Sequence, residues 1–171
     1  QGHNKEAEAK NKEAEEKGET PTETLIKPII GCEFNICENH LDKSRQDNGY
    51  QVVILAKNKQ GYHNLTKMAS IASTKGFYYV PRIDKAIVEQ YKSDLMVLSG
   101  GINGEIPSKI LNIGTKQAEE ALLWWKEQFG DDFYLEVMRH NQEDENRVNE
   151  TLVEFSKKYG VKLIATNNTF Y

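Results

Sequence analysis

Two carboxylates and one histidine have the residue types and positions that could bind a divalent metal ion. Glu33 interrupts the apolar run of residues 27–37, and Glu136 shares one face of a later segment with His140. Burying an ionised carboxylate is costly unless it is paired or coordinates a metal. Glu33 is therefore a candidate metal ligand, an ion-pair member or a solvated residue. His140 is equally consistent with a hydrogen-bonded structural residue. For Glu136 we favour a salt bridge to an arginine.

The other three histidines have less suitable positions for metal binding. His3 lies in a charged leader and His40 in a polar loop, so we expect both to be solvated. His63 falls in the first turn of a predicted helix, where it is expected to face water. These positions leave His140 as the histidine best placed for a site.

One aromatic and basic cluster could bind nucleic acid by stacking on bases and contacting phosphates. It comprises Tyr78, Tyr79, Arg82 and Lys85, although aromatic residues before a proline are also common in packed loops. Trp125 has helical spacing with apolar residues, which predicts a core position instead. The chain contains no Walker loop, Cys-x-x-Cys pair, Ser-His-Asp arrangement or GxGxxG motif.

The composition is that of one modest domain. The chain has 171 residues, of which 28% are charged, and a net charge of −4, which gives no global attraction to nucleic acid. No apolar run approaches the ~20 residues of a membrane span. Cys32 and Cys37 fall on opposite faces of a predicted strand, so a disulfide between them is not expected. This pattern suits a reduced, cytoplasmic setting.

The elements that must position these residues begin after a charged leader. Residues 1–24 contain a near-exact seven-residue repeat with alanine as its main apolar residue, which predicts a solvated helix or a disordered insertion. Strands are predicted at residues 27–37, 50–56, 95–99, 133–140 and 161–166, and helices at 58–76, 83–91, 106–111, 117–129 and 143–159. Asn58 is the predicted N-cap of the first helix, and Gly160 is predicted to end the last one.

This alternation predicts an α/β fold with a parallel sheet, either open or rolled into a barrel. In such sheets the chemistry lies at the carboxyl ends of the strands. The polar residues that we expect there are Asn35, Asn58, Ser99, His140, Asn167 and Asn168.

Several segments resemble a known family. Residues 27–34, KPIIGCEF, resemble a strand of the PHP (polymerase and histidinol phosphatase) domain of bacterial DNA polymerase III alpha subunits, the DnaE family. Further matching segments follow in the same order from about residue 25 to residue 171: VILAKN at 53–58, GYHNL at 61–65, GFYY at 76–79, PRID at 81–84, LSG at 98–100, GEIP at 104–107, FYLE at 133–136 and ATN at 165–167.

This resemblance implies a distorted (β/α)7 TIM-like barrel with divalent zinc, manganese or iron at the carboxyl ends of its strands. Glu33 and His140 stand at ligand positions of the family. Gln51 stands where active members place a histidine, and Asn168 and Phe170 replace their final aspartate and histidine. Phenylalanine cannot bind a metal, and amides are poorer ligands than carboxylate or imidazole. We therefore expect no cofactor in this segment and interpret Glu33 as a remnant, held by hydrogen bonds or an ion pair.

The resemblance implies that residues 25–171 are the carboxyl-terminal portion of a PHP domain within a longer polypeptide. The whole protein would synthesise DNA with magnesium in its polymerase domain. The PHP portion would be an inactivated phosphoesterase that acts as a scaffold. Its partners would be the other domains of the alpha subunit, a proofreading exonuclease and, through the whole polymerase, DNA, but no membrane.

Two other interpretations remain open at this point. The first is a metal-dependent phosphoesterase or 3′–5′ exonuclease with the unusual ligands Glu33, Glu136, His140 and Asn168. The second is a stand-alone nucleic-acid-binding module that uses Tyr78, Tyr79 and Arg82.

Overall fold

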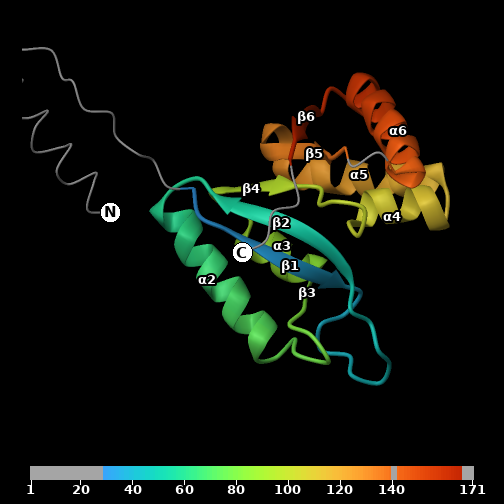
Figure 1. The fold of residues 1–171 in the computed structure, drawn as a ribbon. Helices are drawn as coiled ribbons and strands as arrows, with labels where there is room; N and C mark the ends of the chain where they lie inside the picture. The colour runs from blue at the N-terminus through green and yellow to red at the C-terminus, as the bar shows by residue number, and fades with distance from the viewer. Residues whose placement is uncertain (1–28, 140–141, 167–171) are drawn as a thin grey trace, which may run out of the picture.

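A computed structural model describes residues 29–139 and 142–166 of the chain. Helices and strands alternate along most of this length (Figure 1). The strands are β1 (Gly31–Cys37), β2 (Tyr50–Ala56), β3 (Ile83–Asp84), β4 (Leu95–Leu98), β5 (Phe133–Val137) and β6 (Lys162–Ala165). The helices are α2 (Lys59–Ser73), α3 (Lys85–Tyr91), α4 (Glu105–Asn112), α5 (Thr115–Phe129) and α6 (Glu143–Tyr159), with a 3-10 turn at Gly130–Asp132.

The six described strands form one sheet in the order β3-β1-β2-β4-β5-β6. β2 is antiparallel to both of its neighbours, β1 and β4, whereas the other pairs are parallel. The expectation of a parallel sheet was therefore wrong for β2. The reason is the connection: β1 and β2 are joined by a loop without a helix, and a parallel pairing needs a crossover that returns the chain to the same edge.

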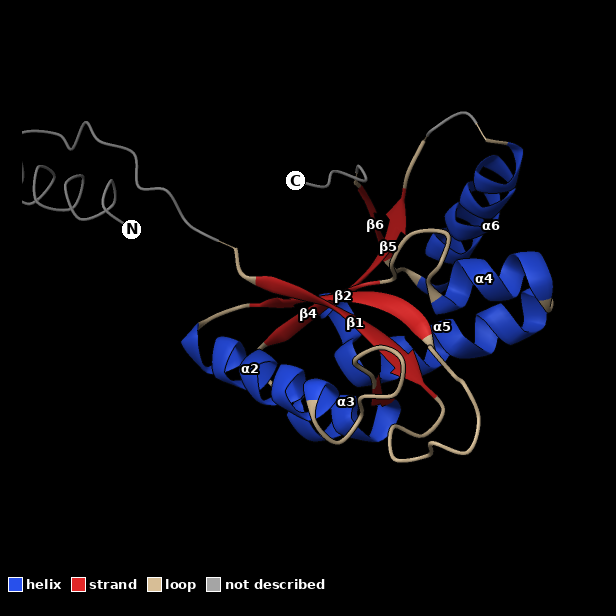
Figure 2. Cartoon of the chain, turned by 60° about the horizontal axis from the view of Figure 1, so that its bottom comes forward, coloured by secondary structure: helices blue, strands red, loops and turns tan. Residues whose placement is uncertain are grey.

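One face of β1 and β2 is packed against helices. Figure 2 shows α2 and α3 on one side of β1, β2 and β4. Period-2 alternation buries Phe34 and Ile36 of β1 and Val52 and Ile54 of β2. The apolar face of α2 supplies the other side of this core, with Leu65, Met68 and Ala72 buried.

The second half of the sheet is packed against α5. Trp125 is buried, and the centroid of its ring lies 6.0 Å from that of Phe129 and 6.4 Å from that of Phe133 on β5. The prediction that Trp125 belongs to the core is confirmed.

Helix α6 ends at Gly160, whose φ of 66° is the left-handed conformation that glycine adopts readily at a helix end.

Two predictions on the architecture concern more than the described residues. β3 and β6 are the edges of the sheet within the described ranges, so a closed barrel stays a prediction. The leader, residues 1–24, lies outside those ranges, and its helical or disordered state and the boundary at residue 25 stay predictions too. Among the helices that the structure describes, none is long and apolar enough to cross a membrane.

Candidate functional site

Two of the predicted polar residues, Asn35 and Ser99, lie at one edge of the sheet, whereas His140, Asn167 and Asn168 lie outside the described residues. Asn35 on β1 is the register partner of Gln51 at the start of β2, and Ser99 follows the end of β4. The same edge includes the end of β5, where Glu136 lies. Asn58 was wrongly placed with this group, because β2 runs in the opposite direction and ends at the other edge. Its side chain instead caps α2, with Oδ1 accepting from the Gly61 N–H at 3.0 Å.

Glu33 lies on the face of β1 opposite the helices. Its register partner is Val53, two residues from Gln51 on β2. The Glu33 side chain is exposed rather than buried, because the described part of the chain places no helix over this face. Within the same residues no hydrogen bond or ion pair reaches its carboxylate, contrary to the expectation for a remnant ligand.

Glu136 is the buried carboxylate of this edge, with 6% of its surface exposed. Its backbone N–H donates to Ser99 Oγ at 2.9 Å, which ties β5 to β4. The Thr166 hydroxyl donates to Glu136 Oε1. Within the described residues the partner of this carboxylate is thus a hydroxyl and not the arginine that we favoured. Oε2 is buried and has no hydrogen-bond partner among residues 29–139 and 142–166.

The remaining ligand positions lie outside the described residues. These are His140, Asn168 and Phe170, so their predicted roles are not tested. Within residues 29–139 and 142–166, no three His, Cys, Asp or Glu side chains come together as a group that could hold a metal ion. The described residues alone do not fit a metal cluster.

The proposed nucleic-acid cluster is arranged differently from the expectation. Tyr79 is exposed, with a φ of 64°, and its ring contacts that of Tyr78 edge to face at 4.7 Å between centroids. Arg82, however, is fully buried, with 0% of its surface exposed. It donates to four backbone carbonyls, those of His40, Asp42, Asp47 and Gly76. Arg82 cannot contact a phosphate, so the cluster loses its central cation.

His40 is buried beside Arg82, although it was expected to be solvated. Its Nδ1 lies 2.5 Å from Asp84 Oδ2, and its backbone N–H donates to the same oxygen at 3.1 Å. Sequence reasoning missed this pair, because the two residues are far apart in the chain and His40 has polar neighbours.

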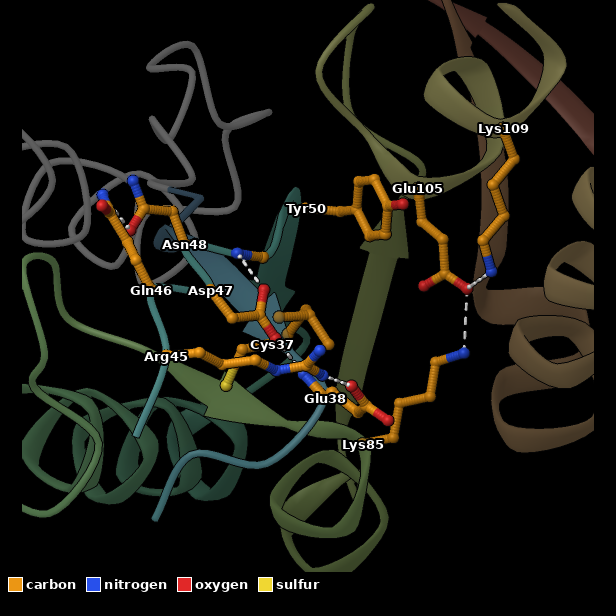
Figure 3. A pocket seen from close by; sticks show the side chains of 12 residues that line it. Cys37, Glu38, Arg45, Gln46, Asp47, Asn48, Tyr50, Lys85, Glu105 and Lys109 are labelled. Atoms are coloured by element: carbon orange, nitrogen blue, oxygen red, sulfur yellow. Dashed lines mark hydrogen bonds and ion pairs between the residues drawn. The ribbon is translucent and has the colours of Figure 1, made fainter. Parts of the chain in front are cut away.

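A cavity that the sequence did not predict lies near the same edge of the sheet. Its volume is about 690 Å³, and it lies between the loop after β1 and the first turns of α3 and α4 (Figure 3). On one wall Lys85 and Lys109 both donate to Glu105 Oε1, at 2.9 and 3.2 Å. The spacing of Glu105 and Lys109 on a helix was a signal for part of this group.

The opposite wall is built by the loop itself. Asp47 accepts from the N–H of Glu38 at 2.9 Å and from that of Gly49 at 3.0 Å, which fixes the turn. Arg45 forms an ion pair with the Glu38 carboxylate, and both side chains are exposed. Burial raises the pKa of the Cys37 thiol at the base of the cavity, although Arg82 partly opposes this effect. Cys37 is therefore poorly suited to act as a nucleophile.

Comparisons with known proteins agree with one another. The family model described as the PHP domain matches residues 4–140. The DNA polymerase III subunit alpha of Borreliella burgdorferi is 44% identical over 150 residues, 85% of this chain and 13% of that protein. The same subunit of Campylobacter jejuni is 37% identical over 158 residues, 85% of this chain and 13% of that protein. That of Thermus aquaticus is 40% identical over 151 residues, with shares of 85% and 12%. The chain thus spans about an eighth of the length of these relatives.

Proposed function

The chain belongs to the PHP domain family, and we propose on that basis that it is a segment of a DNA polymerase III alpha subunit. The identity of 37–44% to three such subunits supports this assignment. The whole protein would synthesise DNA in the cytoplasm, and the polymerase carboxylates and their magnesium would lie outside this chain. The complete domain would close into the distorted (β/α)7 barrel that the resemblance implies.

Within that subunit, we propose that the PHP portion is an inactivated phosphoesterase that acts as a scaffold. Gln51 carries this proposal. It lies at the edge of the sheet where the chemistry of α/β folds is found, and it has a neutral amide where active members of the family have an imidazole. The exposed position of Glu33 agrees with this interpretation, because a metal ligand needs partners that hold it in place. The scaffold would support the polymerase domain and dock a proofreading exonuclease.

Metal analysis of the full-length protein tests the scaffold proposal. We expect less than one equivalent of zinc, manganese or iron after purification without chelators, and no change in the Glu33→Ala variant. One equivalent or more of bound metal that disappears in Glu33→Ala would contradict the proposal. The variant should retain DNA synthesis, which serves as the control for folding.

One observation favours the alternative, a metal-dependent phosphoesterase or 3′–5′ exonuclease that uses Glu33, Glu136, His140 and Asn168. The buried Oε2 of Glu136 has no hydrogen-bond partner in the described part of the chain, and such a carboxylate oxygen would be satisfied by a cation. The test is removal of 3′-terminal nucleotides from labelled DNA by the full-length protein. An activity that requires added Mn²⁺ and is lost in Glu136→Gln, while DNA synthesis persists, would establish this alternative.

A further inference from the structure

The cavity beside the loop after β1 is lined by three cationic and three acidic side chains, which are unequally distributed between its two walls. One carboxylate, Glu105, faces two ammonium groups, those of Lys85 and Lys109. The Glu105 side chain is buried, with 7% exposed, and it can neutralise only one of the two lysines. Lys85 and Lys109 are 36% and 23% exposed, so both remain accessible from the cavity. This wall therefore carries a net positive charge.

The positions of the two lysines suit one shared anion. Both ammonium nitrogens lie within 3.2 Å of the same oxygen, so they are close enough together to contact a single phosphate group. Each also lies near an aromatic ring: Lys85 Nζ is 4.7 Å from the centroid of Trp124, and Lys109 Nζ is 5.9 Å from that of Tyr50. These contacts restrict where the ammonium groups can lie before any ligand binds.

The opposite wall can supply a third cation. Arg45 pairs with Glu38, but both side chains are exposed, and an exposed ion pair of this kind is easily exchanged for another partner. The Asp47 carboxylate faces the same space, but it is held by two backbone N–H groups of its own loop. Figure 3 shows Arg45 with Glu38 on the loop side and the lysine pair with Glu105 on the helix side.

We propose that this cavity binds a small phosphate-bearing ligand, with Lys85 and Lys109 as the phosphate-binding residues. A guanidinium and two ammonium groups match the charge and hydrogen-bonding capacity of phosphate oxygens. The volume of about 690 Å³ falls in the range of small-molecule sites and exceeds what a single phosphate ion would fill. A pyrophosphate or a nucleotide is the expected class of ligand. This proposal does not depend on the polymerase assignment.

Lysine acetylation of the full-length protein, read residue by residue by mass spectrometry, tests the proposal without interference from other nucleotide sites. Inorganic pyrophosphate and ADP are the two probes. We expect saturable protection of Lys85 and Lys109 and no protection of Lys116, an exposed lysine on α5. Protection by pyrophosphate alone would assign the site to free pyrophosphate, and stronger protection by ADP would indicate contacts to the nucleoside.

Variants provide the matched control. In Lys109→Met we expect protection of Lys85 to require at least a tenfold higher concentration of probe, whereas Lys116→Met, with the same change of charge, should leave it unchanged. Absence of protection at millimolar probe would overturn the proposal, as would equal protection of Lys116. The measurement on the unmodified protein remains decisive if Lys109→Met fails to fold.

Discussion

Asp84 joins a loop and a helix through one carboxylate. Oδ2 accepts from the backbone N–H of His40 and lies beside its ring, and Oδ1 accepts from the Ile87 N–H at 3.1 Å, which caps α3. Burial alone would raise the pKa of this carboxyl. The hydrogen bonds from His40 and Ile87 outweigh burial and lower the pKa below its ordinary value of 3.8. The ionised form is therefore the one that stabilises the fold.

The first prediction is a loss of stability in acid that depends on Asp84. A carboxyl whose pKa is lower in the folded than in the unfolded state stabilises the fold at any pH above the unfolded value. That contribution is lost as the pH falls through the folded pKa. We expect the free energy of unfolding to decrease below about pH 4, as measured by urea denaturation at a series of pH values. Asp84→Asn should be less stable at neutral pH and show a shallower decrease.

The prediction would be contradicted if the stability of Asp84→Asn decreased with pH at the same slope as that of the wild-type protein. Asp42 and Glu119 also have lowered pKa values, so some acid sensitivity should remain in Asp84→Asn. If the slopes of the two proteins are equal below pH 4, the hydrogen bonds to Asp84 do not contribute as the structure indicates.

At the scale of single residues, the sequence predicts which helix or strand a residue belongs to better than it predicts which residues its side chain contacts. Trp125 could be placed in the core from helical spacing alone. Arg82 and His40 could not be placed, because each is buried by contacts with segments far away in the chain. A guanidinium that satisfies four backbone carbonyls has the same sequence signature as one that faces solvent. The lysine pair on Glu105 similarly depends on how α3 meets α4.

Among the elements, the loop between β1 and β2 depends on one glycine. Gly49 has a φ of 72°, which side chains rarely adopt, and a Cβ on it would lie 2.4 Å from the carbonyl carbon and oxygen of Ile36. Both the conformation and the space therefore require glycine here. The Asp47 carboxylate accepts a hydrogen bond from the Gly49 N–H. Gly49 therefore also orients the loop that forms one wall of the cavity.

The second prediction compares two glycines with positive φ. Gly160 has a φ of 66° in the left-handed helical region but open space around a Cβ, so Gly160→Ala isolates the cost of the backbone conformation, about 1–2 kcal/mol. Gly49→Ala adds a backbone clash and should cost clearly more. Urea denaturation of both variants provides the measurement. Equal losses would show that the loop shifts to accommodate the methyl group.

The helices and strands themselves were largely predictable, because their signals are local. The Asn58 cap and the apolar spacing locate α2, and α6 ends before Gly160 as expected. The direction of β2 was not predictable by the same means. A strand has the same period-2 pattern in either direction, so direction depends on the connection, and the polar loop at residues 38–49 could have contained a short helix.

For the molecule as a whole, the two edges of the described sheet differ. β3 is only two residues long, and short edge strands are poor templates for association. All four residues of β6 are exposed, with Leu163 38% and Ile164 36% exposed. Within the described residues, β6 therefore combines an unpaired backbone edge with apolar side chains. In a longer polypeptide this edge is available for pairing with a further strand.

The third prediction is that the isolated 171-residue chain associates with itself through β6. An exposed apolar edge strand tends to pair with another copy of itself unless another strand covers it. Sedimentation velocity at increasing concentration should show a shift toward dimers or larger species. Ile164→Lys places a charge at this edge and should restore a monomer, whereas Lys157→Ala on the exposed side of α6 should not. A monomer at every concentration, with a sharp cooperative thermal transition, would mean that β6 is already protected and that the sheet needs no further strand.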